Sequence, residues 1–171
     1  PVQFVPVKND IRINLTITDK HGLGIKLNEV GPELSGEELD KLEQTVRSRL
    51  PKAKWLMLCG SLPPGAPADF YQRLIQIAHA QNVQTLLDTD GDALIAGLEA
   101  NPTVVTPNQP EAERLLNRAL LTRNHFIEAA ARLVEMGAQA AILSLGARGA
   151  IGVLGERMWE AIPPRIDVLS P

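Results

Sequence analysis

The sequence predicts an α/β protein with a mainly parallel central sheet and helices on both faces. Short apolar runs alternate with segments of helical periodicity over residues 52–145, which is the order expected of parallel strands joined by crossover helices. The clearest run, from Trp55 to Cys59, lacks the alternation of a half-exposed strand and therefore indicates burial on both faces. A separate alternating segment over residues 11–30 predicts a small hairpin outside this sheet.

The hairpin prediction depends on a two-residue period. Apolar and polar side chains alternate over residues 11–18, turn-forming residues occupy 19–24, and the alternation roughly resumes over 25–30. In the first strand one face is expected to carry Ile11, Ile13, Leu15 and Ile17, and the resumed alternation rests on Ile25, Leu27 and Val30. Because the residues between them are largely polar, we expect a half-exposed element.

Two capping boxes mark the starts of helices. Ser35 and Glu38 form the first, and Pro51 ends the helix that follows. Asn108 and Glu111 form the second, directly after a strand. The remaining periodicities predict helices over residues 70–80, 93–98 and 124–136 and strands over residues 83–87, 103–106, 140–145, 150–154 and 158–162.

Composition excludes several classes of protein. The chain has 171 residues, 44% of them hydrophobic and 22% charged, which is ordinary for a globular protein with a buried core. A net charge of -3 offers no basic surface for nucleic acid, and no apolar run approaches the roughly 20 residues that span a bilayer. We therefore expect neither nucleic acid nor membrane as a partner, and a cytoplasmic location. The single cysteine, Cys59, falls in an apolar strand and is expected to be a small core residue.

Polar residues follow the predicted strands. In open α/β sheets ligands bind beyond the carboxyl ends of the strands, so these residues are expected to form a polar rim. They are Ser61, Asp88, Asn108, Glu111, Ser144 and Gly146. Each also has a purely structural interpretation, as a turn residue or a helix cap. Taken alone, the residues indicate an α/β domain with a rim that suits anionic ligands.

Six motifs in order carry a resemblance to a known family. They are Arg12-Ile-Asn14, Gly31-Pro-Glu-Leu34, Gly60-Ser-Leu-Pro-Pro-Gly65, Leu87-Asp-Thr-Asp-Gly91, Pro107-Asn-Gln-Pro-Glu111 and Ser144-Leu-Gly-Ala-Arg-Gly149. In order and spacing they resemble the PfkB/ribokinase family of carbohydrate kinases, and the first and third resemble its phosphosugar branch. The resemblance implies a ribokinase-like fold, with a β lid over residues 1–30 and an α/β kinase core over residues 31–171 that is incomplete at both ends.

The resemblance also implies a substrate site. Residues at the matching positions would bind a sugar phosphate: fructose 1-phosphate, fructose 6-phosphate or tagatose 6-phosphate. These residues are Arg12, Asn14 and Ser61. A guanidinium fork suits the phosphate already on the sugar, because it donates two directed, charge-assisted hydrogen bonds.

A nucleotide site is implied in the same way. The positions that would contact ATP are Asn108, Ser144, Gly146 and Gly149. Asp88 and Glu111 would contribute carboxylates to the environment of Mg2+ near the nucleotide phosphates. The resemblance therefore predicts ATP-dependent phosphoryl transfer to a sugar-phosphate hydroxyl, and the lid could pair with a second copy to give a homodimer.

Two departures from the family keep alternatives open. The family's Gly-Ala-Gly-Asp loop, which carries the general base, has no counterpart here, and Asp167 precedes the point where it would begin, so no catalytic residue is assigned. Thr106 stands where phosphosugar relatives often carry lysine, which favours a kinase for an unphosphorylated sugar or a nucleoside. The missing base also leaves a noncatalytic ligand-binding fragment as an alternative.

Overall fold

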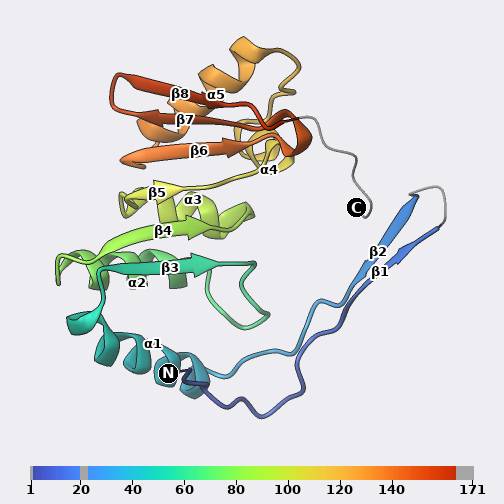
Figure 1. Cartoon of the computed structure of the whole chain (residues 1–171). Helices are drawn as coiled ribbons and strands as arrows, with labels where there is room; N and C mark the ends of the chain where they lie inside the picture. The colour runs from blue at the N-terminus through green and yellow to red at the C-terminus, as the bar shows by residue number, and fades with distance from the viewer. Residues whose placement is uncertain (1, 20–22, 165–171) are drawn as a thin grey trace.

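A computed structural model describes residues 2–19 and 23–164, and Asp167 lies outside these ranges. The chain forms a six-stranded sheet with helices packed on it and a separate two-stranded hairpin (Figure 1). The helices are α1 (Gly36–Arg49), α2 (Phe70–His79), α3 (Gly91–Glu99), α4 (Gln109–Leu116) and α5 (Arg123–Glu135), with short 3-10 turns at Leu50–Lys52 and Gly146–Arg148.

The large sheet has the order β3-β4-β5-β6-β7-β8. Its strands are β3 (Trp55–Cys59), β4 (Gln84–Asp88), β5 (Val104–Val105), β6 (Ala140–Ser144), β7 (Ala150–Leu154) and β8 (Arg157–Ala161). The first four are parallel, and β7 and β8 continue the sheet as antiparallel strands. The mainly parallel sheet expected from the sequence is therefore confirmed, with β5 shorter than the strand predicted over residues 103–106.

Helices cover only one face of this sheet in the part of the chain that the structure describes. Leu87, Val105 and Leu143 point into the covered face and are fully buried, and α2, α3 and α5 lie behind the sheet in Figure 1. Trp55 and Met57 of β3 point to the opposite face and remain exposed. Of the two helical layers predicted, the described residues supply one, and the apolar run of β3 does not reveal what packs against each face.

The hairpin extends away from the body of the molecule (Figure 1). Its strands, β1 (Asn14–Thr18) and β2 (Gly24–Asn28), pair antiparallel with Leu15 opposite Leu27 and Ile17 opposite Ile25. All ten strand residues are exposed, so the hairpin is confirmed but neither of its faces is packed.

Residues 3–8 lie along α1 rather than with the hairpin. Gln3 accepts a hydrogen bond from Nε of Arg49 at 2.8 Å, and the backbone N–H of Lys8 donates to Glu38. Glu38 also completes the predicted capping box with Ser35, which is confirmed at the start of α1. Hydrogen bonding to Ser35 is the main cause that lowers the pKa of Glu38, so this carboxylate remains charged and keeps the helix start capped.

Candidate functional site

The parallel strands deliver their following loops to one edge of the sheet. In Figure 1 the arrowheads of β3, β4 and β6 point to the same side. Ser61 follows β3, Asp88 ends β4, Asn108 follows β5 and Ser144 ends β6. Four of the predicted rim positions therefore share an edge, as the order of strands and loops predicts.

Arg12 and Ser61 are brought into direct contact although 49 positions separate them. The Arg12 guanidinium donates to Oγ of Ser61 at 3.0 Å. Gly31 lies against the aliphatic part of Arg12, because a Cβ added to this glycine would sit 3.4 Å from the Arg12 Cβ. With φ at +91°, Gly31 holds a backbone conformation that suits glycine. The hydrogen bond from the Arg12 guanidinium to the Ser61 hydroxyl therefore joins the segment before β1 to the loop after β3.

Asn14 and Asp88 are placed differently. Asn14 is the first residue of β1, opposite Asn28, and is exposed. Asp88 pairs in register with Cys59, and its backbone carbonyl accepts the N–H of Gly60 at 2.8 Å. Asp88 is therefore close to the Ser61 loop, at the end of the strand next to β3.

A hollow surrounds the Arg12 guanidinium. It has a volume of about 490 Å³ and is lined by Arg12, Ser61, Pro63, Asp90 and Asp92, among others. This volume lies within the range of sites that bind small molecules. The hollow thus presents one guanidinium, one hydroxyl and two carboxylates to a polar ligand.

Asp90 is a member of this hollow that the sequence did not assign. It precedes α3, and its carboxylate forms an ion pair at 3.4 Å with Arg114 of α4. Both side chains are well exposed, so the pair adds little to folding stability. It nevertheless offsets one of the two negative charges beside Arg12.

The second capping box lies in the part of the rim where the sequence predicted a nucleotide site. The backbone N–H and the side-chain amide of Asn108 donate to the two oxygens of Glu111 at 2.9 and 2.6 Å, and the Glu111 N–H donates back at 3.0 Å. Asn108 also forms a parallel bridge to Ser144. This prediction is confirmed as a helix cap, and the cap itself holds Asn108, Glu111 and Ser144 close together.

The two glycines of the loop after β6 have different surroundings. Gly149 has φ at +98°, and an added Cβ would lie 1.8 Å from the backbone carbonyl of Ala161. Gly146 has φ at +59° and open space where a Cβ would stand. Gly149 is therefore required by the fold, whereas Gly146 leaves room for a ligand to approach the backbone.

The carboxylates are not gathered into a ready-made metal cage. Among residues 2–19 and 23–164, no group of three or more His, Cys, Asp or Glu side chains could hold a metal ion. Glu111 is nonetheless half exposed at a helix N-terminus, and Asp88 is exposed at a strand end. Such isolated carboxylates fit Mg2+, which keeps several waters and takes further oxygens from substrate phosphates.

Cys59 is not a core residue. It is the last residue of β3, on the face of the sheet that carries Trp55 and Met57 and that no described helix covers, which we call the bare face. Cys59 is exposed there, so the prediction that it is a small core residue is wrong. Desolvation by neighbouring atoms, and then the Asp88 carboxylate, raise the pKa of its thiol. A thiol with a raised pKa forms less thiolate, which argues against a nucleophilic role.

Tyr71 of α2 is a further residue that the sequence did not assign. Its hydroxyl donates to the backbone carbonyl of Gly60 at 3.0 Å and lies 3.4 Å from that of Cys59. Burial raises the pKa of Tyr71, and the charges of Arg12 and Asp88 act on it in opposite directions. An aromatic residue in a helix usually indicates core packing, so only the tertiary structure identifies this contact.

Arg148 connects the loop after β6 to neighbouring helices. Its guanidinium lies 4.8 Å from the centre of the Phe126 ring and also donates to Gln109, the first residue of α4. Gln109 donates in turn to Glu113 and to the carbonyl of Leu120. These contacts join segments that are distant in sequence to the start of α4 and to α5, so sequence reasoning had no signal for them.

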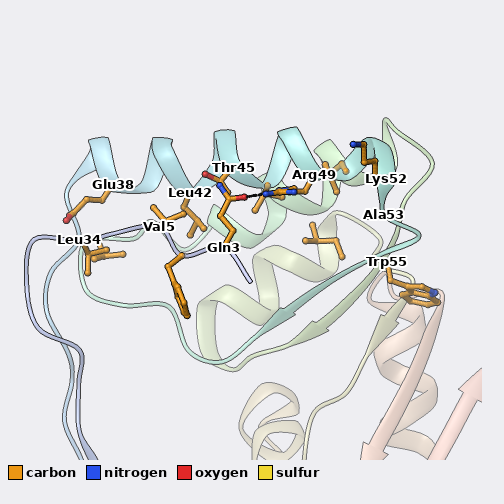
Figure 2. Close-up of a pocket in the computed structure, with 15 residues that line it drawn as sticks. Gln3, Val5, Leu34, Glu38, Leu42, Thr45, Arg49, Lys52, Ala53 and Trp55 are labelled. Atoms are coloured by element: carbon orange, nitrogen blue, oxygen red, sulfur yellow. Dashed lines mark hydrogen bonds between the residues drawn. The ribbon is translucent and has the colours of Figure 1, made fainter. Parts of the chain in front are cut away.

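A larger groove lies elsewhere on the molecule. It has a volume of about 680 Å³ and runs beneath α1 to Trp55, the first residue of β3. Figure 2 shows Val5, Leu34 and Leu42 lining it, with Gln3 bonded to Arg49 above. Its lining is mainly apolar and lacks the polar loops of the carboxyl edge, so we place the candidate site at the rim.

Among the described residues no helix is long and apolar enough to cross a membrane.

Known proteins are similar to this chain in sequence and in fold. The profile of the pfkB family carbohydrate kinases matches residues 1–171. The 1-phosphofructokinase of Escherichia coli K12 is 33% identical over 168 residues, covering 98% of this chain and 54% of the relative. That of Bacillus subtilis is 30% identical over 162 residues, covering 95% of this chain and 52% of the relative.

Solved structures give the same result. Phosphofructokinase-2 of Escherichia coli in its tetrameric inhibited form superposes with a TM-score of 0.87 at 33% identity, over 98% of this chain and 56% of that one. Its complex with fructose-6-phosphate gives a TM-score of 0.80 at 32% identity, over 92% and 52% of the two chains. The chain spans about half the length of the relatives it matches. By sequence profile, motif order and fold, it belongs to the pfkB family of carbohydrate kinases.

Proposed function

We propose that this chain is part of a kinase that transfers a phosphoryl group from ATP to a hydroxyl of a sugar phosphate. The observation that carries the proposal is the contact of Arg12 with Ser61 in a hollow at the carboxyl edge of the sheet. An arginine there suits a phosphate already present on the sugar. Relatives named 1-phosphofructokinase, and one solved with fructose-6-phosphate, support the same substrate class. The cytoplasm is the proposed location.

The residues of the two halves of the rim have separate tasks in this proposal. Arg12 and Ser61 bind the phosphate of the sugar, with Asn14 presented from the lid. Asn108, Ser144, Gly146 and Gly149 border the nucleotide phosphates. A bound Mg2+ would neutralise charge on those phosphates, and Glu111 with Asp88 would hold its coordinated waters. We assign no general base among the described residues.

The substrate half is tested by replacing Arg12. With the complete polypeptide, Arg12→Ala is expected to weaken binding of fructose 1-phosphate, fructose 6-phosphate or tagatose 6-phosphate by about 10- to 100-fold, the effect of losing a charged hydrogen bond. Isothermal titration measures the binding, and release of ADP measures turnover. Lys26→Ala is the matched control, because it removes another exposed cation of the lid. Lys26 lies in β2, opposite Thr16 of β1.

Two outcomes contradict the sugar-phosphate proposal. Unphosphorylated fructose or ribose could be bound and phosphorylated as well as the sugar phosphates, or Arg12→Ala could behave like Lys26→Ala. The first outcome favours a kinase for an unphosphorylated sugar or a nucleoside, the class that Thr106 also favours.

The two loop glycines test the nucleotide half. Gly146→Ala adds a methyl group where the fold leaves space, so we expect about 1 kcal/mol of destabilisation from its positive φ together with weaker ATP binding. Gly149→Ala forces the methyl group into the Ala161 carbonyl, so it is expected to destabilise the fold by about 3 kcal/mol or more. Equal ATP affinity in wild type and Gly146→Ala would contradict the assignment of Gly146.

A noncatalytic ligand-binding fragment is the second candidate, because no general base is assigned. The intact mass of the natural polypeptide, compared with 18.6 kDa for these residues, distinguishes the two. A mass near that value, with binding of ATP but no release of ADP, favours the fragment. A larger mass with turnover favours the kinase.

We also propose that the lid pairs two copies of the chain. Leu15, Ile17, Ile25 and Leu27 form two cross-strand pairs on one face of the hairpin, each about half exposed. An isolated two-stranded hairpin is only marginally stable in water, so an apolar face of this kind needs a partner. Ile17→Glu is expected to shift the protein to monomers in light scattering. Thr16→Glu, one residue away on the polar face, is the control and should leave the dimer intact.

A further inference from the structure

The loop that carries Ser61 is anchored where it leaves β3, at Gly60. Gly60 adopts φ at +93°, a conformation in which the chain turns sharply out of β3. Its N–H donates to the Asp88 carbonyl at 2.8 Å, and its carbonyl accepts the Tyr71 hydroxyl at 3.0 Å. Gly60 is therefore held at both of its backbone polar groups, once by β4 and once by α2.

Holding the Gly60 carbonyl also orients the next residue. The Gly60 carbonyl and the Ser61 N–H belong to the same planar trans peptide, so they point in opposite directions. When Tyr71 fixes the carbonyl on its own side, the Ser61 N–H is directed to the other side. Among the described residues, none accepts a hydrogen bond from this N–H, so a donor is left open next to the Arg12 guanidinium.

The chemistry of the hollow makes this donor useful. A phosphate oxygen accepts hydrogen bonds from backbone N–H groups as well as from guanidinium. Arg12 reaches Oγ of the same serine at 3.0 Å. The Ser61 amide, the Ser61 hydroxyl and the Arg12 guanidinium are therefore grouped around a single residue, Ser61. Their relative direction depends on the orientation of the Gly60–Ser61 peptide.

We propose that Tyr71 is a positioning residue of the sugar-phosphate site, whose hydroxyl sets the Gly60–Ser61 peptide so that Ser61 presents its N–H beside Arg12. This inference rests on the proposed function, since it assumes that a sugar phosphate occupies the hollow. The Tyr71 ring is half-buried against the core, and phenylalanine would fill the same space. The hydroxyl contributes a hydrogen bond that orients the Gly60–Ser61 peptide.

The test removes only this hydroxyl. Tyr71→Phe keeps the ring, and we expect the dissociation constant for the sugar phosphate that wild type binds to rise about fivefold, as for the loss of one neutral hydrogen bond. Affinity for ATP is expected to stay within twofold. A purely structural role would lower the melting temperature while leaving both dissociation constants unchanged. Titration calorimetry and thermal unfolding of the complete polypeptide measure these quantities.

A neighbour on the same helix supplies the control. Gln72 donates to Glu99 at 3.2 Å and does not touch the loop, so Gln72→Ala loses a side-chain hydrogen bond one position away from Tyr71. It is expected to leave the dissociation constant for the sugar phosphate unchanged.

A double-mutant cycle identifies the route of the effect. Ser61→Pro removes the backbone N–H that Tyr71 is proposed to direct, together with the hydroxyl that meets Arg12. If Tyr71 acts through this N–H, Tyr71→Phe costs less sugar-phosphate affinity in the Ser61→Pro background than in wild type, because residues that act together are not additive. Full additivity would overturn the inference.

The outcomes separate the two proposals. If wild type binds no sugar phosphate, both the proposed function and the role of Tyr71 are overturned. If wild type binds one and Tyr71→Phe binds it equally well, the proposed function survives and the inference is overturned. A selective loss of sugar-phosphate affinity, with the ATP affinity retained, supports both.

Discussion

The two faces of the six-stranded sheet are built from the same strands but have different surroundings. In β3, Leu58 is 6% exposed beneath the helices, whereas its neighbour Met57 is 63% exposed on the opposite face. The bare face continues across the sheet with Ile142 of β6 and Trp159 of β8. Both faces are apolar, but helices from the described residues stabilise only one of them.

This difference shows that an apolar residue in a strand favours burial, but that the sequence does not show whether another element covers it. Contiguous apolar surface of this kind is uncommon on a free protein and marks a place where something else packs. The covered face already carries two clusters of buried residues, one with α2 and α3 and the other with α4, both of which include residues of α5 and of the strands. The predictions below therefore contrast the two faces.

The largest expected difference is within β3. Leu58→Ala is expected to lower the free energy of unfolding by about 3 kcal/mol, because it leaves a cavity under the helices. Met57→Ala, the control, is expected to change it by less than about 0.5 kcal/mol, as for most exposed positions. Urea denaturation measures both. Equal losses would mean that the bare face is covered in the native molecule.

A smaller effect is expected where α3 packs on the covered face. Gly97→Ala places a methyl group 2.5 Å from Cδ2 of Leu87, which is fully buried. Overpacking costs about 1–3 kcal/mol, and the better helix propensity of alanine returns up to about 1 kcal/mol. We expect a net loss of about 1 kcal/mol in chemical denaturation. A gain in stability would show that α3 is not tightly packed on β4.

A weaker, pH-dependent effect is expected from His79. Nε2 of its imidazole ring lies 3.1 Å from the hydroxyl of Thr85, a buried residue of the covered face, and burial lowers the pKa of His79 below 6.5. The unfolded chain then binds more protons than the folded chain as pH falls through 6.5. The free energy of unfolding should therefore be highest above this pH and fall between pH 6.5 and the lowered folded pKa.

The contribution of His79 is isolated by comparing wild type with His79→Gln. Denaturation midpoints of both proteins are measured at pH 7.5 and pH 5.5, above the range in which most carboxylates titrate. The fall in stability is expected to be smaller in the variant. An identical fall would assign the pH dependence to other groups.

The smallest change in stability is expected on the bare face at the sheet edge. Trp159→Lys should leave the free energy of unfolding within about 0.5 kcal/mol, because the side chain is exposed. It should reduce self-association through the bare face, since a charged side chain opposes the burial of that apolar surface against another chain. Met158→Lys, the neighbour on the other face of β8, is the control in size-exclusion chromatography. Equal effects of both variants would locate association elsewhere.

Local patterns were sufficient to predict much of the architecture. The capping boxes at Ser35 and Asn108, the alternation in the hairpin and the order of strands and helices all use interactions between residues close in sequence. The same patterns placed Ser61 and Ser144 at one edge, because parallel strands end at the same side of a sheet.

The contacts within the rim were beyond such patterns. Arg12 and Ser61 meet across 49 positions, and Asp90 pairs with Arg114 from the next helix. Tyr71 has the sequence properties of a core aromatic, and its hydroxyl becomes informative only when the Gly60 carbonyl is found beside it. The error at Cys59 has the same origin, since a strand residue belongs to one face or the other only after the sheet has formed.

The sequence by itself determined which segments become strands and helices, where the loops fall, and which family the motifs resemble, because these depend on local periodicity, caps and turn residues. The tertiary structure alone decided which face of the sheet is covered, which of the two loop glycines is required by the fold, and which side chains meet around Arg12. The physical reason is that burial and hydrogen bonding between distant segments depend on how the strands are stacked and the helices packed, and no local pattern records that arrangement.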